Sequence, residues 1–562
     1  MSRKSYDYVV IGSGSAGSVI ASRLSENPAA RVLILEAGGG DETMLYRRPG
    51  MLAIVYQVPK LKERCDWGYR TMPQRHMDNR RMPWTRGKIV GGCSTVNGML
   101  YIRGNHKNYD DWSAWGNRGW SFREVLPYFK KSENHEDGAS EYHGAGGPLQ
   151  VTRQQGISVI SQAYVEAISE VCGVPVLDDF NGATQECAGI YQMTCRDRRR
   201  SSAAVAFLHP ALASRPNLEL VSGATVTSID IERGRARAVR YVANGEVCVA
   251  HADAEIILSA GVIGSPQILM LSGIGPAAHL REHGIAVHAD VPGVGENLHD
   301  HLMAPVRFLA TKDAGHRSTP GHFFTGLFNE FVFQKGWFGK TFLEGGAFVK
   351  SKPSELVPDI QFLSIPWAYP EPNDDGPEPG KISTAYSFTM LPGLIYPKSR
   401  GTIRLSSSDP FAVPLIDPHY LEEPADLQLL VDAVRLVREI AHAKPLAGYL
   451  KGEATPGDHI RSDADIQAAV RLYGKTIYHP VGTCKMGVDP LAVVDPELRV
   501  RGIEGLRVAD ASIMPAIVGG NTNAPAIMIG EKAADLVRSV TDVERPSTKQ
   551  STDRAASVSA RS

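Results

Sequence analysis

The most constraining feature of the chain is its N-terminal stretch "DYVVIGSGSAGSVIASRL" (residues 7–24). A short apolar run from Tyr8 to Ile11 is followed by Gly12, Gly14 and Gly17 in G-x-G-x-x-G spacing, and then by apolar residues at helical intervals. This pattern predicts a strand, a tight turn and an amphipathic helix. Glycines at such a turn let the backbone approach a pyrophosphate at the helix N-terminus. The stretch therefore predicts a dinucleotide-binding unit.

A second apolar run, "RVLILEAG", ends in Glu36. In a parallel sheet this residue lies at the carboxyl end of the next strand, where an acidic side chain can bind ribose hydroxyls. The strand, helix and strand together predict an α/β fold with a Rossmann-like domain. They do not distinguish NAD from FAD, because both cofactors present an ADP half to this unit.

Two further segments favour FAD. The stretch "WTRGKIVGGCSTVNGMLYIRG" (residues 84–104) is rich in glycine and small residues, so its backbone can lie against a flat ligand. Near the C-terminus, a helix is expected to begin close to Pro525, and its N-terminus suits the negative charge of a reduced flavin. Either segment alone could be an ordinary loop or helix, but their joint occurrence favours FAD.

Composition narrows the class of protein. The chain has 562 residues, 43% of them hydrophobic, and a formal net charge of -1. A net charge so close to zero provides no electrostatic field that would attract nucleic acid or an anionic membrane. Its seven cysteines show no C-x-x-C pairing, which favours a reducing compartment. No apolar run is long enough for a membrane span. We expect a cytoplasmic enzyme, with oligomeric state and peripheral membrane association left open.

Five separated motifs support a family resemblance. They are "GKIVGGCSTVNGM" (87–99), "GVIGSPQILMLSGIG" (261–275), "PGVGENLHDH" (292–301), "YHPVGTCKMG" (478–487) and "LRVADASIMPAIVGGNTNAPAIMIGEKAADL" (506–536). With the N-terminal unit they resemble, from about residue 5 to 540, the glucose-methanol-choline oxidoreductases, flavoproteins that oxidise alcohols. The chain is most similar to the choline dehydrogenase-like members.

The resemblance implies a set of FAD-binding residues. Those for the ADP half and adenine are Gly12, Ser13, Gly14, Gly17, Glu36 and Val226; those for the isoalloxazine region and ribityl chain are Gly92, Asn97, Gly98, Asp510 and Ala511. Some relatives attach FAD covalently through a histidine just before the Asn97 position. Because Val96 stands there, we expect non-covalent FAD.

The resemblance also implies the catalytic pair. His479 matches the family's base, and Asn521 matches a position that is histidine or asparagine in relatives, although Asn523 lies two residues further on. A neutral histidine can accept the hydroxyl proton while hydride passes from carbon to flavin N5. Asparagine can donate to the developing alkoxide. The expected reaction is oxidation of an alcohol, with electrons passed to oxygen, a quinone or another acceptor.

Two other functions stay open from the sequence. Hydroxynitrile lyases share this scaffold and bind FAD without net redox turnover. A non-catalytic flavoprotein could keep the fold for binding alone, although His479 and Asn521 argue against that. The substrate alcohol is not determined, because fold does not fix substrate.

The resemblance implies two domains. A discontinuous FAD-binding domain is expected over 1–155, 205–310 and 475–540, and a substrate domain over 156–204 and 311–474. The latter is expected to have an antiparallel sheet flanked by helices, with strands at 358–365 and 401–407. An amphipathic helix is predicted at 427–443. The polar segment 541–562 is expected to be disordered.

Two other segments suggest possible functional roles. "HDH" at 299–301 could suggest metal ligation, but no third ligand has supporting spacing, so no metal is expected and hydrogen bonding in a loop is favoured. The aromatic segment "FNEFVFQKGWFGKTF" (328–342) could form a substrate lid or wall, or could simply pack against the protein.

Overall fold

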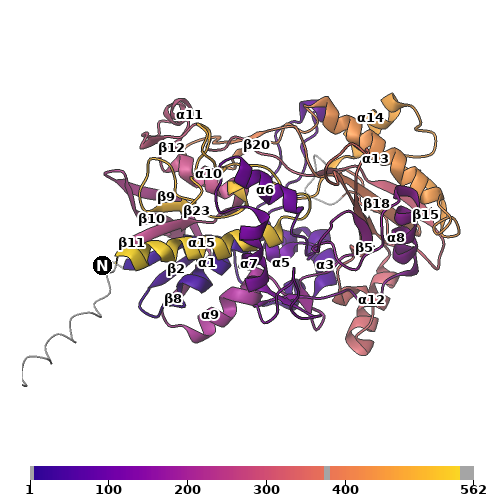
Figure 1. Ribbon diagram of the computed structural model, residues 1–562, viewed down its shortest axis with the longest axis horizontal. Coiled ribbons are helices and arrows are strands. Elements are labelled where there is room, and N and C mark those ends of the chain that lie inside the picture. The colour runs from indigo at the N-terminus through magenta and orange to yellow at the C-terminus, as the bar shows by residue number, and fades with distance from the viewer. Residues whose placement is uncertain (1–4, 373–379, 545–562) are drawn as a thin grey trace, which may run out of the picture.

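The computed structural model describes residues 5–372 and 380–544. Two β-sheets organise these residues, and segments from both ends of the chain contribute to the first of them (Figure 1). The first sheet has the order β8-β2-β1-β11-β10-β9, with β23 paired to β11. Its strands are β1 (Ser5–Ile11), β2 (Val32–Glu36), β8 (Leu218–Ser222), β9 (Ala224–Glu232), β10 (Arg235–Ala243), β11 (Glu246–Leu258) and β23 (Leu506–Val508).

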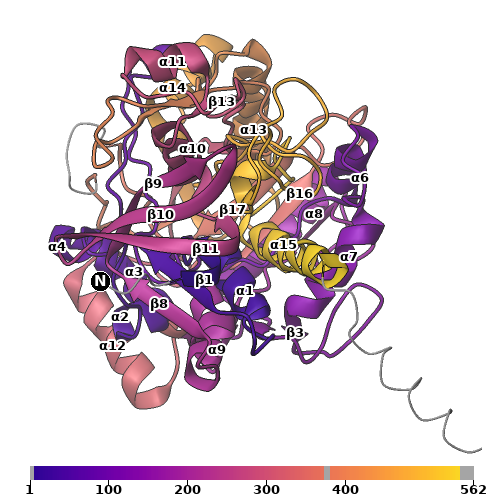
Figure 2. The ribbon, with the colours of Figure 1, turned by 90° about the vertical axis from the view of Figure 1, so that its left-hand side faces the viewer.

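The long strand β11 joins a parallel part of this sheet to an antiparallel part. Its second half runs parallel to β1 and β23, whereas its first half pairs antiparallel with β10. Strand β2 lies between β1 and β8, parallel to both. Helices α1 (Ser15–Leu24) and α15 (Asn523–Glu544) lie side by side against the sheet (Figures 1 and 2). The predicted Rossmann-like unit is confirmed.

Burial explains why the first two strands are uninterrupted apolar runs. Val9 and Val10 of β1 and Leu33 and Ile34 of β2 are buried, as expected of a parallel sheet that is covered on both faces. Gly17 is required by packing, because a Cβ there would lie 1.9 Å from the carbonyl oxygen of Gly12. Helix α1 therefore lies directly against the turn that follows β1.

The second sheet is antiparallel, with the order β21-β15-β18-β17-β16-β5. Its strands are β5 (Cys187–Ile190), β15 (Val306–Ala310), β16 (Gly345–Val349), β17 (Ile360–Ile365), β18 (Ser387–Leu394) and β21 (Leu450–Thr455). The short strands β14 (Leu302–Met303) and β22 (Lys475–Thr476) extend it. Helices α8 (Val159–Cys172) and α13 (Pro424–His442) pack against it. This confirms an antiparallel sheet flanked by helices.

Three details differ from the expected layout. Strands β14, β15 and β22 belong to the second sheet, although their residues fall within the segments 205–310 and 475–540 that were expected in the FAD-binding domain. The predicted strand at 401–407 forms as β19 (Thr402–Arg404), but it pairs with β20 (Leu415–Asp417) in a separate two-stranded sheet. Helix α15 continues to Glu544, so residues 541–544 are helical. The rest of the expected disordered tail lies outside the described residues.

The remaining α-helices have 14 residues or fewer. The other helices are α2 (Met44–Arg47), α3 (Leu52–Gln57), α4 (Pro59–Lys62), α5 (Cys93–Val96), α6 (His106–Ala114), α7 (Phe122–Ser132), α9 (His209–Ser214), α10 (Gly261–Leu271), α11 (Ala277–Glu282), α12 (Pro320–Phe333) and α14 (Asp463–Tyr473). Helical turns η1 (Pro49–Met51), η4 (Trp337–Gly339) and η5 (Ala511–Ile513) lie near the site described below. Within the described ranges, none of the helices is long and apolar enough to cross a membrane.

Candidate active site

A cavity of about 810 Å³ reaches from one sheet to the other. At one end it is lined by Glu36 of β2 and Val226 of β9. At the other end it is lined by Leu363 of β17, Leu391 of β18 and the loop that carries His479. A single space therefore joins the predicted dinucleotide loops to the predicted catalytic residues.

The dinucleotide end is built on the turn after β1. Gly12 has φ 93°, and a Cβ there would lie 2.5 Å from the carbonyl oxygen of Ser259, so only glycine fits. Gly14 has no atom within 4 Å of where its Cβ would be, so this side of the turn is open to the cavity. It immediately precedes α1, whose N-terminal N–H groups can bind an anion.

Glu36 is buried beside this turn. Its carboxylate accepts hydrogen bonds from the backbone N–H and hydroxyl of Ser13, at 3.0 and 2.7 Å, and from the backbone N–H of Gly38 at 2.8 Å. Burial raises the pKa of Glu36, and the donors from Ser13 and Gly38 oppose that rise. Glu36 also lines the cavity, so its carboxylate is held in place to meet a ligand there.

The second glycine-rich segment lies directly on the first. Gly92 has φ 53°, and a Cβ there would lie 2.8 Å from the Cα of Gly14. Two residues after α5, a Cβ on Gly98 would lie 2.9 Å from the side chain of Leu343. Between them, the Asn97 side-chain oxygen accepts from the backbone N–H of Met99 at 3.0 Å and from Arg200 at 2.8 Å. These contacts fix the backbone that forms the middle of the cavity wall.

Asp510 joins α10 to η5 at the same wall. Its carboxylate accepts from the Gly261 N–H at 2.9 Å, the Ser265 hydroxyl at 2.6 Å and the Ser512 N–H at 2.8 Å. Asp510 and Ala511 both line the cavity. The hydrogen bonds of this carboxylate thus hold the first turns of α10 and η5 together at the cavity wall.

His479 lies on a loop whose backbone is firmly held. The preceding residue, Tyr478, has φ 65°, which is uncommon for a bulky residue and typical of strain kept at functional sites. Its carbonyl oxygen accepts from Arg86 at 2.6 Å. The backbone N–H of His479 donates to Asp300 at 2.7 Å, and Asp300 also accepts short hydrogen bonds from Tyr420 and Thr476. Burial raises the pKa of Asp300, while these donors oppose the rise.

The hydrogen bonds of His479 determine which of its nitrogens carries the proton. His301 Nε2 lies 2.9 Å from the carbonyl oxygen of Ile395, which can only accept, so this nitrogen of His301 carries a hydrogen. In a neutral His301 the other nitrogen, Nδ1, is then an acceptor. It lies 3.0 Å from Nδ1 of His479, which must donate. The lone pair of His479 therefore lies on Nε2.

The electrostatics favour neutral rings. Burial lowers the pKa of His301 to about 3, against hydrogen bonds to backbone carbonyls that act in the opposite direction. The pKa of His479 lies well below its usual value, first because the ring is buried and then because His301 and Arg86 are near. His479 is therefore a neutral imidazole at neutral pH, with Nε2 able to accept a proton.

Asn521 completes the site. Its side-chain nitrogen lies 3.1 Å from Nε2 of His479, and its side-chain oxygen accepts from Gln361 at 3.1 Å. Because the Gln361 amide occupies the oxygen, the Asn521 N–H groups face His479. Asn523 instead accepts from the hydroxyl of Ser15, at 2.7 Å. The structure thus brings Asn521, and not Asn523, to the predicted base.

The "HDH" residues act through hydrogen bonds. His299 lies 2.6 Å from the carbonyl oxygen of Asn297 and accepts from the backbone N–H of Ile517 at 2.8 Å, while Asp300 and His301 hold His479 from two sides. Sequence reasoning placed these residues only in a loop and gave Gln361 no role. The residues "HDH" end one of the five family motifs, which could have indicated a role at the active site. Nothing in the sequence around Gln361 indicated such a role.

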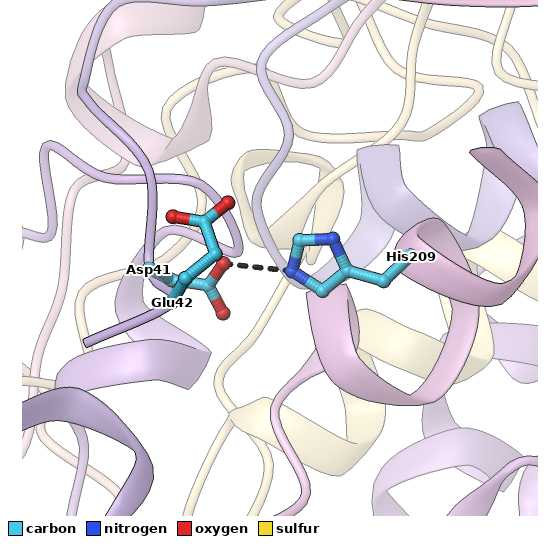
Figure 3. A group of neighbouring side chains, drawn as sticks. All are labelled: Asp41, Glu42 and His209. Atoms are coloured by element: carbon cyan, nitrogen blue, oxygen red, sulfur yellow. Dashed lines mark hydrogen bonds and ion pairs between the residues drawn. The ribbon is translucent and has the colours of Figure 1, made fainter. Parts of the chain in front are cut away.

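A different group has ligand atoms close enough to hold a metal ion. Asp41, Glu42 and His209 lie together away from the residues that line the cavity, and a hydrogen bond joins Asp41 to His209 (Figure 3). The distance between Asp41 and His209 Nε2 is 2.7 Å, and Arg47 lies 3.2 Å from the other oxygen of Asp41. Arg47 and His209 thus already contact the two oxygens of the buried Asp41 carboxylate, so the group is explained by polar contacts that join the loop after β2 to α2 and α9.

Comparison with known proteins identifies the scaffold. The profile of the GMC oxidoreductase family matches residues 6–303 and a second GMC oxidoreductase profile matches residues 397–530. The chain belongs to the GMC oxidoreductase family. It is 42% identical over 542 residues to an alcohol dehydrogenase [acceptor] of Pseudomonas putida, covering 95% of each chain. It is 43% identical over 535 residues to an oxygen-dependent choline dehydrogenase of Sinorhizobium medicae, covering 94% of this chain and 95% of the relative.

Solved structures show the same fold. A formate oxidase of Aspergillus oryzae, studied for FAD modification, superposes with a TM-score of 0.87 at 25% identity, over 96% of this chain and 99% of that one. In this GMC oxidoreductase, most of the predicted site residues line the one cavity described above. The exceptions are Ser13, which holds Glu36, and Gly17, which packs against Gly12. Val96 lines the cavity beside Asn97.

Proposed function

We propose that this GMC oxidoreductase oxidises a small-molecule alcohol to an aldehyde or ketone, with FAD as the hydride acceptor. One observation carries the proposal: Nε2 of His479, which carries the lone pair, and the side-chain nitrogen of Asn521 lie 3.1 Å apart in the same cavity that Gly14 and Glu36 line. A base, a donor for an oxyanion and a dinucleotide cradle are the three parts that such a reaction needs.

The cavity fits FAD in shape and in chemistry. Close backbone approach at Gly12, Gly14 and Gly92 leaves room for a pyrophosphate and a flat ring, and Glu36 supplies an acceptor for ribose hydroxyls. When bound, FAD supplies the two-electron acceptor. The hydrocarbon side chain of Val96 has no nucleophilic atom that could form a covalent link, so we propose non-covalent binding. The segments 1–155, 205–310 and 475–540 make up the proposed FAD-binding domain, except that β14, β15 and β22 belong to the second sheet and are assigned to the substrate domain.

The protein's own residues handle the proton. His479 accepts the hydroxyl proton at Nε2, and His301 keeps the hydrogen on Nδ1 so that Nε2 stays available. Asn521 donates to the oxygen as its negative charge develops, and Gln361 holds the Asn521 amide in the orientation that allows this. Because both partners are neutral, the site adds no negative charge that would oppose transfer of hydride to the cofactor.

Apolar side chains form the substrate end of the cavity. They include Phe342, Leu363, Trp367 and Tyr369. They exclude water from His479 and Asn521, which strengthens the interactions of both with the reacting oxygen. Electrons then pass to oxygen or to another acceptor such as a quinone.

Anaerobic mixing with a panel of alcohols tests the proposal. The purified protein is expected to be yellow and to lose its flavin absorbance with at least one alcohol. Acid precipitation is expected to leave free FAD in the supernatant. Flavin that stays oxidised with every alcohol while a cyanohydrin is cleaved would show a hydroxynitrile lyase on this scaffold instead.

A further inference from the structure

The surface of α12 has the reverse of the usual distribution of side chains. Of its 14 residues only Gly326 and Glu330 are buried, although the helix sequence "PGHFFTGLFNEFVF" is strongly apolar. The exposed apolar side chains are Phe324 (67%), Phe328 (58%), Phe331 (48%), Val332 (55%) and Phe333 (57%). A helix of a globular protein normally turns its apolar side inward.

Polar contacts hold α12 in this orientation. The carboxylate of Glu330 is buried and accepts from Arg48 at 2.9 Å and from Arg198 at 3.0 Å. One turn earlier, Gly326 lies so close to Trp337 and Phe338 that a Cβ there would be 2.9 Å from each ring. The side of α12 that faces the protein is therefore fixed by an ion pair and a close contact. Its phenylalanines remain on the outside.

The exposed surface is uncharged and is bordered by cations. From Pro320 to Lys335 the only acidic residue is Glu330, whose charge is already paired. Arg317 before the helix and Lys335 after it are both exposed. Helices that lie in the interface of a phospholipid bilayer combine an exposed apolar face with lysine and arginine residues that attract anionic headgroups.

The size of the patch distinguishes a bilayer from a second copy of the chain. Taking about 200 Å² for a fully exposed phenylalanine, the five side chains present roughly 500 Å² of apolar surface. A stable protein interface covers about 800 Å² on each partner, whereas such a patch on a monomer is large enough to be functional. We propose that α12 docks this protein on the surface of a phospholipid bilayer, with Phe324, Phe328 and Phe331 inserted among the lipids.

The docked face lies close to the candidate active site. Phe323 of α12 packs against Phe338 with ring centroids 5.1 Å apart, and the neighbouring Trp337 lies 5.7 Å from Trp367. Trp367 lines the cavity. Figure 2 shows α12 at the edge of the molecule, below α3 and α4, and residues of α3 also line the cavity. A continuous set of aromatic contacts, from Phe323 through Trp337 and Phe338 to Trp367, thus joins α12 to the cavity wall.

Vesicle flotation with the full-length, FAD-loaded protein tests the proposal. The unmutated protein is expected to float with vesicles of phosphatidylcholine and phosphatidylglycerol. The double variant Phe324→Ser/Phe328→Ser is expected to bind about tenfold or more weakly, because two large apolar side chains no longer leave water. Leu356→Ser, which removes an exposed apolar side chain elsewhere, is the matched control and is expected to bind as the unmutated protein does.

The proposal is overturned if the unmutated protein does not float with vesicles, or if the double variant floats equally well. It is also overturned by a dimer in sedimentation that the double variant converts to a monomer without any binding to vesicles. Hydrogen exchange of the unmutated protein needs no substitution: vesicles are expected to slow exchange of the α12 amides, and unchanged exchange also contradicts docking.

Discussion

Removing the acceptor that His301 offers to His479 is expected to slow flavin reduction. In His301→Leu, the Nδ1 hydrogen of His479 loses its partner 3.0 Å away inside a buried site. An unsatisfied buried donor costs about 1–3 kcal/mol. The ring can avoid that cost by moving its hydrogen to Nε2, where it blocks the base. We therefore expect reduction to slow by roughly 10- to 100-fold, which corresponds to about 1.4–2.8 kcal/mol.

His301→Gln separates this role from simple loss of volume. Its carboxamide can donate to the Ile395 carbonyl and accept from His479, which reproduces both hydrogen bonds of His301. We expect His301→Gln to reduce its flavin within severalfold of the parent rate. Stopped-flow measurements under anaerobic conditions, with FAD content and melting temperature matched, compare the two variants.

The pH profile gives a second readout. His301 is one of the groups that lower the pKa of His479, so its replacement by leucine should move the apparent pKa of the reduction rate upward. The reasoning is refuted if His301→Leu reduces as fast as the parent with an unchanged profile. It is refuted equally if His301→Gln is as slow as His301→Leu.

Three further predictions concern stability, cofactor binding and the oxyanion donor. In the folded protein the pKa values of His301 and His479 lie below the usual 6.5, so the unfolded chain binds more protons in acid. The stabilisation is therefore complete above about pH 6.5 and is lost as pH falls. The melting temperature of His301→Gln should accordingly fall less steeply with decreasing pH than that of the parent. Glu36→Lys should lower the FAD content of the purified protein, and an unchanged absorbance ratio would count against the ribose role. Asn521→Ala should slow flavin reduction by about 10²- to 10³-fold and Asn521→Asp by more, because aspartate adds a negative charge. The same changes at Asn523, which contacts Ser15, should leave the rate of flavin reduction closer to that of the parent. If the changes at Asn523 slowed reduction more than those at Asn521, Asn523 would be the oxyanion donor instead.

The parts of the fold that could be predicted depend on short-range patterns. The turn from Gly12 to Gly17 and the strand ending in Glu36 have fixed spacings, and both formed as expected. The helix expected near Pro525 begins at Asn523, which places the proline in the first turn. Strand β19 was found from its composition, but its partner was not, because pairing depends on which segments meet in space.

The candidate site shows the same limit. His479 could be predicted because a motif carries it, but its partners lie far along the chain: His301 is 178 residues away, and Ile395 is 94 residues from His301. The choice between Asn521 and Asn523 also required the structure, since the two lie only two residues apart, one just before α15 and the other at its first residue. In the segment 328–342, Phe342 lines the cavity, as expected of a wall, while Phe328 and Phe331 face outward.

The central claim is that His479 is the base, and flavin reduction in His479→Ala tests it most directly. The variant should keep its FAD, because the residues that cradle the dinucleotide are untouched, and its anaerobic reduction by an alcohol should be about 10²- to 10⁴-fold slower than that of the parent. His76→Ala, which removes an exposed histidine, is the control and should reduce at the parent rate. A His479→Ala protein with full FAD content that is reduced as fast as the parent would contradict the account.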